Sequence, residues 1–108
     1  MPNVTRGVAE IRLSPTARAD LASIDDYSAE QFGDDVADVY SRGFHEVFDL
    51  LRRHPMAGAE KRELGNAVRC FVHRQHRVFY RVDGDVVLII RIIHHAQNAQ
   101  RALRKVAR

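Results

Sequence analysis

Histidine is the residue type in this chain best suited to acid–base or metal chemistry. The chain has six histidines, and four of them lie on or beside apolar stretches with the character of strands: His73, His76, His94 and His95. Side chains with pKa values near neutrality can act as acid and base. As metal ligands they are poorly arranged, because adjacent residues of a strand point to opposite faces and no acidic or cysteine ligand completes a tetrahedral set. We therefore expect neither a metal site nor a cofactor.

Arginines and aromatic residues alternate in the same region. Arg77 and Arg81 flank Phe79 and Tyr80. This combination of basic and aromatic residues is found where proteins stack nucleic-acid bases on aromatic rings. The same residues also fill small cores, which is the interpretation we favour. The single cysteine, Cys70, has no neighbour in sequence that would make it a reactive thiolate.

The net charge of +3 and pI of about 9.5 come from an uneven distribution. Residues 69–81 and the C-terminal tail are basic, whereas residues 20–38 are acidic. A basic half attracts an anionic partner, either nucleic acid or an acidic polypeptide. The alternative is that the charge only keeps a small domain soluble.

Length and composition are those of one small soluble domain. The chain has 108 residues, 45% hydrophobic and 29% charged, and it contains no apolar run long enough to span a bilayer. We expect a flexible leader over residues 1–9 and a single domain over residues 10–108. The N-terminus does not resemble a signal peptide, and one cysteine fits a reducing compartment, so a cytoplasmic location without membrane contact is expected.

The two β-rich runs 77–82 and 86–93 dominate the pattern. Asp83-Gly84 between them predicts a hairpin, because both positions of a tight loop favour residues that tolerate a positive φ. With that loop, Tyr80 is expected to face Val87 and Val78 to face Ile89. The second run is apolar on both faces, as is typical of a central strand.

The remaining elements follow in order along the chain. Residues 10–13 alternate as a short strand, and Ser14-Pro15 begins a helix that closes at Phe32-Gly33. Asp34 or Asp35 is expected to cap a second helix that ends near His54, before Pro55. Residues 55–67 are expected to form an exposed loop, residues 68–73 a strand that turns at Arg74-Gln75, and residues 97–106 a final basic helix.

The predicted fold is α+β with the order β-α-α-β-β-β. An antiparallel sheet carries a helical hairpin on one face, with a possible short C-terminal helix. The alternation assigns these residues to the helix-covered face: Arg69, Phe71, Val78, Tyr80, Val82, Val87, Ile89, Arg91 and Ile93. Acidic residues of the first helix, such as Asp20, are expected to pair with Arg69 or Arg91.

The opposite face is expected to be an exposed apolar surface edged by Arg77 and Arg81, of the kind that marks a binding site. A polypeptide partner would cover it, contacting Val68, Cys70, Val72, Phe79, Leu88, Ile90 and Ile92. The alternative is that the tail helix or a second copy of the chain covers this face.

These residues together resemble the ParE branch of the ParE/RelE toxin superfamily. The resemblance rests on Ile11 to Pro15 leading into Ala19 to Tyr27, on Pro55, Arg62 and Leu64, and on His76 to Val82 and Val87 to His94. It implies the toxin of a type II toxin–antitoxin pair, used in plasmid stabilisation or stress response. Such a toxin inhibits DNA gyrase without hydrolytic chemistry, and a small antitoxin wraps it, sometimes in a higher-order assembly.

Two other functions stay open. RelE-like toxins cut messenger RNA on the ribosome with lysines and arginines of the sheet face and often a C-terminal tyrosine. Arg77 matches one such arginine, but no lysine lies between Lys61 and Lys105, and residues 94–108 contain no tyrosine. A toxin fold kept only as an inactive interaction module is the third hypothesis. For the gyrase inhibitor, we expect target contacts at Arg77, Arg81 and His94, all on one strand face.

Overall fold

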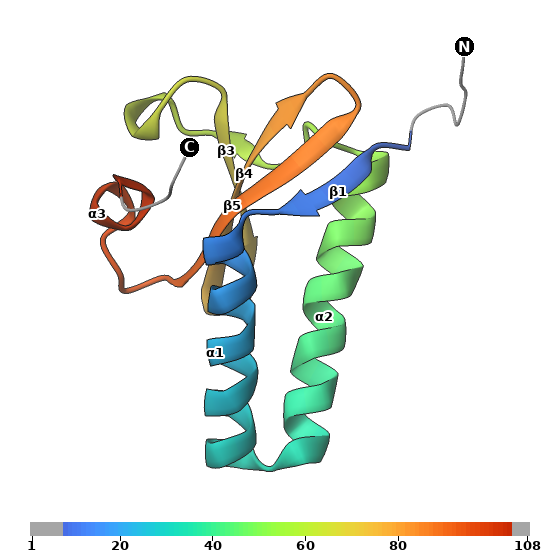
Figure 1. Ribbon diagram of the computed structural model, residues 1–108, viewed down its shortest axis with the longest axis vertical. Helices are drawn as coiled ribbons and strands as arrows, with labels where there is room; N and C mark the ends of the chain where they lie inside the picture. Colours follow the sequence, from blue (N-terminus) through green and yellow to red (C-terminus); the bar gives the residue numbers. More distant parts are fainter. Residues whose placement is uncertain (1–7, 105–108) are drawn as a thin grey trace.

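The computed structural model describes residues 8–104 (Figure 1). Within that range, the elements are β1 (Glu10–Leu13), α1 (Pro15–Phe32), α2 (Asp34–Arg53), β2 (Ala59–Glu60), the 3-10 helix η1 (Arg62–Leu64), β3 (Val68–His73), β4 (His76–Asp83), β5 (Val86–His94) and α3 (Ala99–Arg104). The predicted α+β order with a helical hairpin on one face is confirmed. Residues 55–67, expected to be a loop, contain β2 and η1 because Ala59 and Glu60 pair with the outer edge of β3. The expected leader lies mostly outside the described residues, but Ala9 is buried.

The described residues form a five-stranded sheet in the order β1-β5-β4-β3-β2. Strands β2 to β5 are antiparallel neighbours, whereas β1 runs parallel to β5. The sheet is therefore mixed, and the expectation of a wholly antiparallel sheet was wrong for this pair. The chain between β1 and β5 supplies the long crossover that a parallel pair requires.

The helical hairpin forms where the sequence places its signals. Ser14 caps α1 by accepting a hydrogen bond from the amide of Ala17 at 2.9 Å, and its own hydroxyl donates to the Ile90 carbonyl at 2.7 Å. Gly33, at φ +91°, ends α1 and is also the N-cap of α2. Asp34 and Asp35 lie in the first turn of α2 instead of capping it, where carboxylates interact favourably with the helix dipole.

The helices pack on one face of the sheet and extend well beyond its end (Figure 1). Only the half of the hairpin beside the strands has a sheet surface to cover. The main core between the two layers contains Ala17, Phe44, Val47, Phe48, Leu51, Val78, Tyr80, Val87, Ile89 and Ile92. No helix in residues 8–104 is both long and apolar enough to cross a membrane.

The two strand turns differ from each other in how well the sequence predicts them. The Arg74-Gln75 turn is confirmed, with Phe71 opposite Val78, and Arg74 adopts a φ of +54°. The β4–β5 loop is Gly84-Asp85 instead of Asp83-Gly84, so Tyr80 faces Ile89 and the predicted register was wrong. Only Gly84 takes a positive φ, +61°, as in hairpin loops that place glycine first.

A β-bulge at Ile90 changes the two faces of β5. Tyr80 pairs with Ile89 and Phe79 with Arg91, which leaves Ile90 without an opposite residue. Because an extra residue reverses the alternation beyond it, Ile92 enters the core beneath the helices and Ile93 the opposite cluster. The predicted faces of these two residues were wrong for that reason.

The pair of Asp20 and Arg91 anchors α1 to the bulge. The Arg91 guanidinium donates to both oxygens of the Asp20 carboxylate at 2.7 and 2.8 Å, and the amide of Ile92 donates to the same carboxylate at 2.9 Å. The predicted ion pair is confirmed for Arg91. Arg69 instead donates to the Gly58 carbonyl at 2.7 Å.

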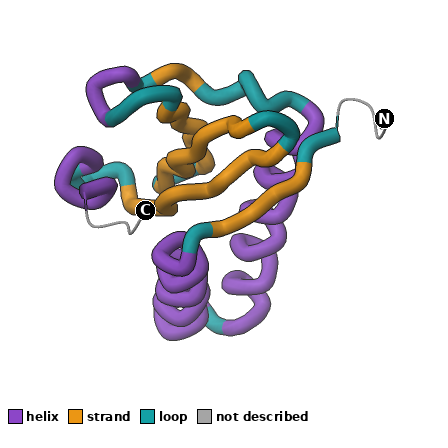
Figure 2. Tube along the Cα trace, turned by 45° about the horizontal axis from the view of Figure 1, so that its top comes forward, coloured by secondary structure: helices purple, strands orange, loops and turns teal. Residues whose placement is uncertain are grey.

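Most of the second face of the sheet is covered by α3 and η1. The small cluster there contains Val68, Cys70, Phe79, Ile90, Ile93 and Ala102, with Leu64, Ala99 and Leu103 packed against it. Figure 2 shows α3 on the side of the sheet away from the long helices. For the residues of this small cluster, the alternative expected from the sequence is therefore correct: the tail helix covers the face. Val106, expected in the same helix, lies outside the described residues.

Candidate functional site

The predicted target contacts are not on one strand face. Arg77 and Arg81 alternate with Phe79 on the α3 side of β4. His94 pairs with His76 and lies on the helix side, because the bulge at Ile90 reverses the end of β5. The three residues therefore form no common patch, and of the three only Arg81 is exposed, whereas Arg77 and His94 are half-buried.

Arg77 is engaged inside the chain. Its guanidinium donates to the carbonyls of Gln97 at 2.7 Å and His95 at 3.3 Å, and lies 5.4 Å from the centroid of the Phe79 ring. These contacts tie the segment before α3 to the sheet, and burial leaves its Nε without a partner within the described residues. Arg77 thus holds the connection to α3.

The seven predicted antitoxin contacts divide by exposure. Within the chain's own cores, the side chains of Val68, Cys70, Phe79, Ile90 and Ile92 are buried. Val72 is 62% exposed and Leu88 is half-buried. The expectation that all seven line an open surface was therefore wrong, because α3 covers most of the face and the bulge turns Ile92 into the main core.

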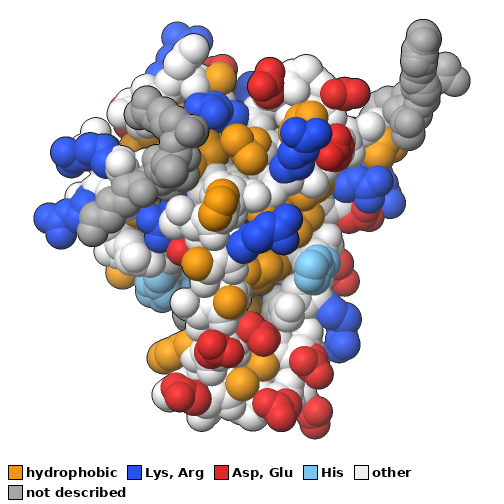
Figure 3. Space-filling view, viewed as in Figure 1, with side chains coloured by type: hydrophobic (Ala, Val, Ile, Leu, Met, Phe, Trp, Pro, Cys, Tyr) orange, Lys and Arg blue, Asp and Glu red, His pale blue; other side chains and the backbone are white. Residues whose placement is uncertain are grey.

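The open apolar surface lies instead at the free end of the helical hairpin. Four side chains of α1 and α2 remain largely exposed there: Tyr27 (61%), Phe32 (64%), Val36 (49%) and Val39 (60%). A groove of about 1030 Å³ runs between this end of the hairpin and the β3–β4 turn. Figure 3 shows acidic side chains around the free end of the hairpin, whereas lysine and arginine gather toward the sheet. The lining of the groove is mostly apolar and also includes Arg42, Glu46 and Arg74.

Histidines and aromatic rings form the inner wall of the groove. A 2.7 Å hydrogen bond joins the Tyr40 hydroxyl to Nδ1 of His76, and the rings of His76 and His94 lie edge to face with centroids 5.6 Å apart. Burial, followed by the nearby histidines, lowers the pKa of His76 to about 4. At neutral pH His76 is therefore uncharged, and this wall is an apolar hydrogen-bonded surface.

His73 packs directly on the backbone of α2. Its ring lies 4.8 Å from that of Phe44, and a Cβ added at Gly43 would come within 2.8 Å of its Nε2. Burial lowers the pKa of His73 as well, and the adjacent Arg74 acts in the same direction. Glycine at position 43 leaves the space that this ring occupies.

The histidines do not assemble into a metal centre. In residues 8–104, no group of three or more histidine, cysteine or acidic side chains is placed to hold an ion. His94 and His95 do not point to opposite faces as expected. Their rings lie 4.4 Å apart at 30°, because β5 ends at His94 and His95 belongs to the following turn.

Sequence patterns missed the groove because its residues have the same helical spacing as core residues. Tyr27 continues the helical spacing of Leu21 and Ile24, which is the spacing of residues that pack on a core. The available signal was helix length. Helices of 18 and 20 residues extend about 27 to 30 Å, longer than most strands of the sheet, so part of the hairpin had to lie beyond it.

Comparison with known proteins agrees with this architecture. The family described as "ParE toxin of type II toxin-antitoxin system, parDE" matches residues 11–99. Toxin ParE1 of Caulobacter vibrioides is 37% identical over 89 residues, which cover 82% of this chain and 92% of that protein. Toxin ParE1 of Mycobacterium tuberculosis is 30% identical over 92 residues, which cover 84% of this chain and 94% of that protein.

Two solved structures share the fold. A chain of the chromosomal ParDE toxin–antitoxin system of P. aeruginosa has a TM-score of 0.70 at 23% identity, covering 82% of this chain and 97% of that one. A chain of the RelBE2 toxin–antitoxin complex of M. tuberculosis has a TM-score of 0.59 at 24% identity, covering 88% of this chain and 100% of that one. The resemblance expected from the sequence is confirmed: this chain belongs to the ParE family of toxins from type II toxin–antitoxin systems.

Proposed function

We propose that this toxin acts in the cytoplasm by inhibiting DNA gyrase, with no hydrolytic chemistry of its own, and that a cognate antitoxin neutralises it. The proposal rests on one observation: the two side chains that could take part in catalysis, Arg77 and His76, are hydrogen-bonded within the chain. Arg77 is bonded to the segment before α3, and His76 is bonded to Tyr40 with its pKa near 4. At neutral pH His76 therefore lacks the proton of an imidazolium acid, and the Arg77 guanidinium already donates to two backbone carbonyls.

The lysines that RNA cleavage would use on the sheet face are also missing from β3, β4 and β5. The sequence has only two lysines, Lys61 and Lys105, and Arg69 is bonded to the carbonyl of Gly58. Arg81 is the exposed arginine of β4, and we propose it as a contact to gyrase. An exposed guanidinium on β4 is suited to positioning a protein partner and provides no acid–base pair by itself.

The groove beside the hairpin is the surface we propose for the antitoxin. A segment that buried Tyr27, Phe32 and Val39 would gain about 1.5 to 3 kcal/mol for each side chain fully removed from water, before its own ordering costs. Val72 is 62% exposed, and of the seven antitoxin contacts expected from the sequence it is the one we still propose. An amphipathic antitoxin helix would fit a groove with this lining.

The activity is tested with two assays on the same purified chain. One follows gyrase-catalysed supercoiling of relaxed plasmid, and the other maps messenger RNA after translation in vitro. We expect supercoiling to stop and the messenger to stay intact. Cleaved messenger with normal supercoiling would instead identify a RelE-like ribonuclease.

The contact residue is tested by Arg81→Ala, with Arg62→Ala as the matched control on another exposed arginine. We expect Arg81→Ala to weaken gyrase inhibition about tenfold at an unchanged thermal unfolding temperature, and Arg62→Ala to change neither. Equal activity of the two variants would exclude Arg81 as a contact. Expression that leaves growth unaffected would favour the inactive interaction module.

A further inference from the structure

Acidic and basic side chains are segregated between the two layers of the fold. The helical hairpin, residues 15–53, contains nine acidic residues and four arginines, a net charge of −5. Residues 59–104, which form β2 to β5, η1 and α3, contain nine lysines and arginines and four acidic residues, a net charge of +5. Figure 3 shows acidic side chains around the free end of the hairpin and basic side chains around α3. The molecule therefore has one basic end.

Three exposed arginines border the small apolar cluster beneath α3. Arg101 and Arg104 are the exposed arginines of α3, whose inward residues pack on this cluster. Arg81 is exposed on β4 opposite Val68, which belongs to the same cluster. Within residues 8–104, none of the three arginines has a carboxylate at ion-pair distance. Arg81, Arg101 and Arg104 together are called the basic face below.

Hydrogen bonds hold α3 in a fixed position on the sheet. Arg91 donates to the Ala102 carbonyl at 2.9 Å, and Arg77 donates to carbonyls of the segment before the helix. At the start of α3, the amide of Arg101 donates to the Asn98 side chain at 2.9 Å. Because both ends of this short helix are tied, its two exposed arginines lie on a rigid support. A ligand that binds them does not have to order the helix first.

The basic face offers charge with little exposed apolar surface. Phe79, Ile90 and Ile93 are buried beneath α3, and Val72 is the only large apolar side chain of β3, β4, β5 and α3 that is largely exposed. The centre of a protein interface is usually apolar. A phosphate backbone instead needs positive charge and hydrogen-bond donors, which guanidinium groups supply. The basic face therefore fits a nucleic acid better than an acidic polypeptide.

The positions of the aromatic rings favour a duplex over a single strand. Proteins that bind single strands stack the bases on accessible aromatic rings. Phe79 and Tyr80 are fully buried, and the largely exposed rings of Tyr27 and Phe32 lie at the free end of the hairpin. No phenylalanine or tyrosine ring is thus available for stacking beside the basic face in the described part of the chain. Contacts to the phosphates of a duplex require no stacking.

We infer that Arg81, Arg101 and Arg104 form a binding site for the phosphate backbone of duplex DNA, without sequence preference. An RNA duplex presents the same phosphate chemistry, and the choice of DNA rests on the proposed function, because gyrase acts on DNA. The acidic hairpin is repelled by the phosphates and points away from the duplex. The basic face thereby orients the toxin on DNA.

The first test measures fluorescence anisotropy of short labelled duplexes with the purified chain, in the absence of gyrase and antitoxin. We expect a Kd of about 10⁻⁶ to 10⁻⁴ M near physiological salt, as for binding without base contacts. The logarithm of the association constant should fall against the logarithm of the salt concentration with a slope of about −3, close to one for each arginine. Two DNA duplexes of unrelated sequence should bind within twofold of each other.

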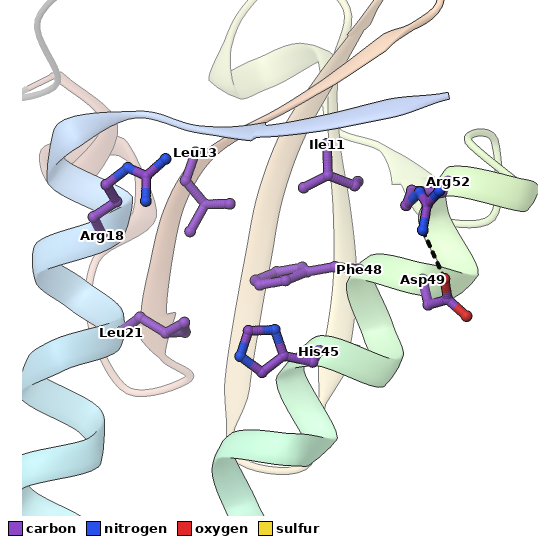
Figure 4. A pocket seen from close by; sticks show the side chains of 8 residues that line it. All are labelled: Ile11, Leu13, Arg18, Leu21, His45, Phe48, Asp49 and Arg52. Carbon is purple, nitrogen blue, oxygen red and sulfur yellow. Dashed lines mark hydrogen bonds and ion pairs between the residues drawn. The ribbon is translucent and has the colours of Figure 1, made fainter. Parts of the chain in front are cut away.

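The second test compares two double variants of equal net charge. Arg101→Ala with Arg104→Ala removes the α3 part of the basic face, and Arg18→Ala with Arg42→Ala is the control. Each pair lowers the net charge from +3 to +1. Arg42 lies on α2, and Figure 4 places Arg18 on α1 beside the cavity of about 420 Å³ between β1 and the helices. Both control residues therefore belong to the helical layer.

The α3 variant should bind DNA at least about tenfold more weakly at low salt, with a salt slope closer to zero by about two. The control variant should stay within about twofold of the native chain. Circular dichroism checks that both variants fold. Equal losses in the two variants would mean that the overall charge attracts the duplex, which overturns the basic face as a site.

The remaining outcomes separate this inference from the proposed function. Absence of DNA binding by a chain that still stops gyrase overturns the inference and leaves the proposed function intact. DNA binding with normal supercoiling overturns gyrase inhibition and leaves the site. Tighter binding of an RNA duplex or of the single strand overturns the assignment to duplex DNA. Displacement of the duplex by polyglutamate at an equal concentration of charges overturns the preference for phosphate.

Discussion

The two halves of the α1–α2 hairpin have similar residues but different surroundings. Beside the sheet, Phe44 is 1% exposed and Leu51 is fully buried, whereas beyond the sheet Phe32 is 64% and Val39 60% exposed. The apolar spacing is helical in both halves. The difference arises because the strands end while the helices continue (Figure 1). Helical periodicity thus shows that one side of a helix is suited to burial and leaves open what covers it.

This difference separates stability from recognition within one element. Side chains between the helices and the sheet contribute to folding, because their burial is complete in the isolated chain. Side chains at the free end contribute only when another molecule covers them. Substitutions of the same residue type in the two halves should therefore have different effects, which makes the comparison testable.

Phe44→Ala should have the largest effect. Removing this ring from the core should lower the free energy of unfolding by about 4 kcal/mol, through lost burial and the cavity left behind. Phe32→Ala is the matched control and should cost less than about 0.5 kcal/mol. Urea unfolding measures both values. Similar losses for the two variants would show that the free end of the hairpin is also packed in solution.

Asp20→Ala should have the next largest effect, because it breaks the attachment of α1 to β5. The variant leaves Arg91 partly buried without its carboxylate, which should lower the free energy of unfolding by about 3 kcal/mol. Asp25→Ala, on the exposed side of the same helix, should be nearly neutral. A loss below about 1 kcal/mol for Asp20→Ala would mean that packing alone positions the hairpin.

Local signals predicted most of the fold. Ser14, Pro15, Gly33 and Pro55 fix the ends of the helices through capping and backbone geometry, which depend on a few neighbouring residues. The Arg74-Gln75 turn and the Asp20–Arg91 pair also followed from the sequence. The bulge at Ile90 did not, because no residue type there requires it and its effect depends on how β4 and β5 align.

The candidate site was less predictable because it depends on contacts between distant elements. The sequence indicates that Val68, Cys70 and Phe79 share a strand face, but only the position of α3 shows that this face is covered. Similarly, the helical stripe containing Tyr27 contains no mark of where the sheet ends. The apolar binding surface of a small domain thus consists of the apolar side chains that no other element covers, and only the packing of the whole domain identifies them.

Gly43→Ala tests the boundary between the two halves. Alanine stabilises a helix by about 1 kcal/mol relative to glycine, but its Cβ would meet Nε2 of His73 at 2.8 Å. We expect a net loss of about 1 kcal/mol in the native sequence and a net gain of about 1 kcal/mol in a His73→Ala background. Thermal unfolding of the four proteins gives the double-mutant cycle. Equal effects in both backgrounds would mean that the ring does not pack on α2.

The smallest predicted effect is a pH dependence arising from His76 in the groove wall. Its pKa is lowered from 6.5 to about 4 on folding, so the unfolded chain binds more protons between these values. Stability should therefore fall as pH falls through this window, since protons favour the unfolded state there. After allowance for solvent screening of a half-buried ring, the loss between pH 7 and pH 5 should be about 1 kcal/mol. His76→Gln should remove this component from the unfolding profile. If the unfolding free energy of the variant depends on pH in the same way as that of the native chain, the pKa of His76 is not lowered by folding. The groove wall would then be more hydrated than the hydrogen bond between His76 and Tyr40 implies.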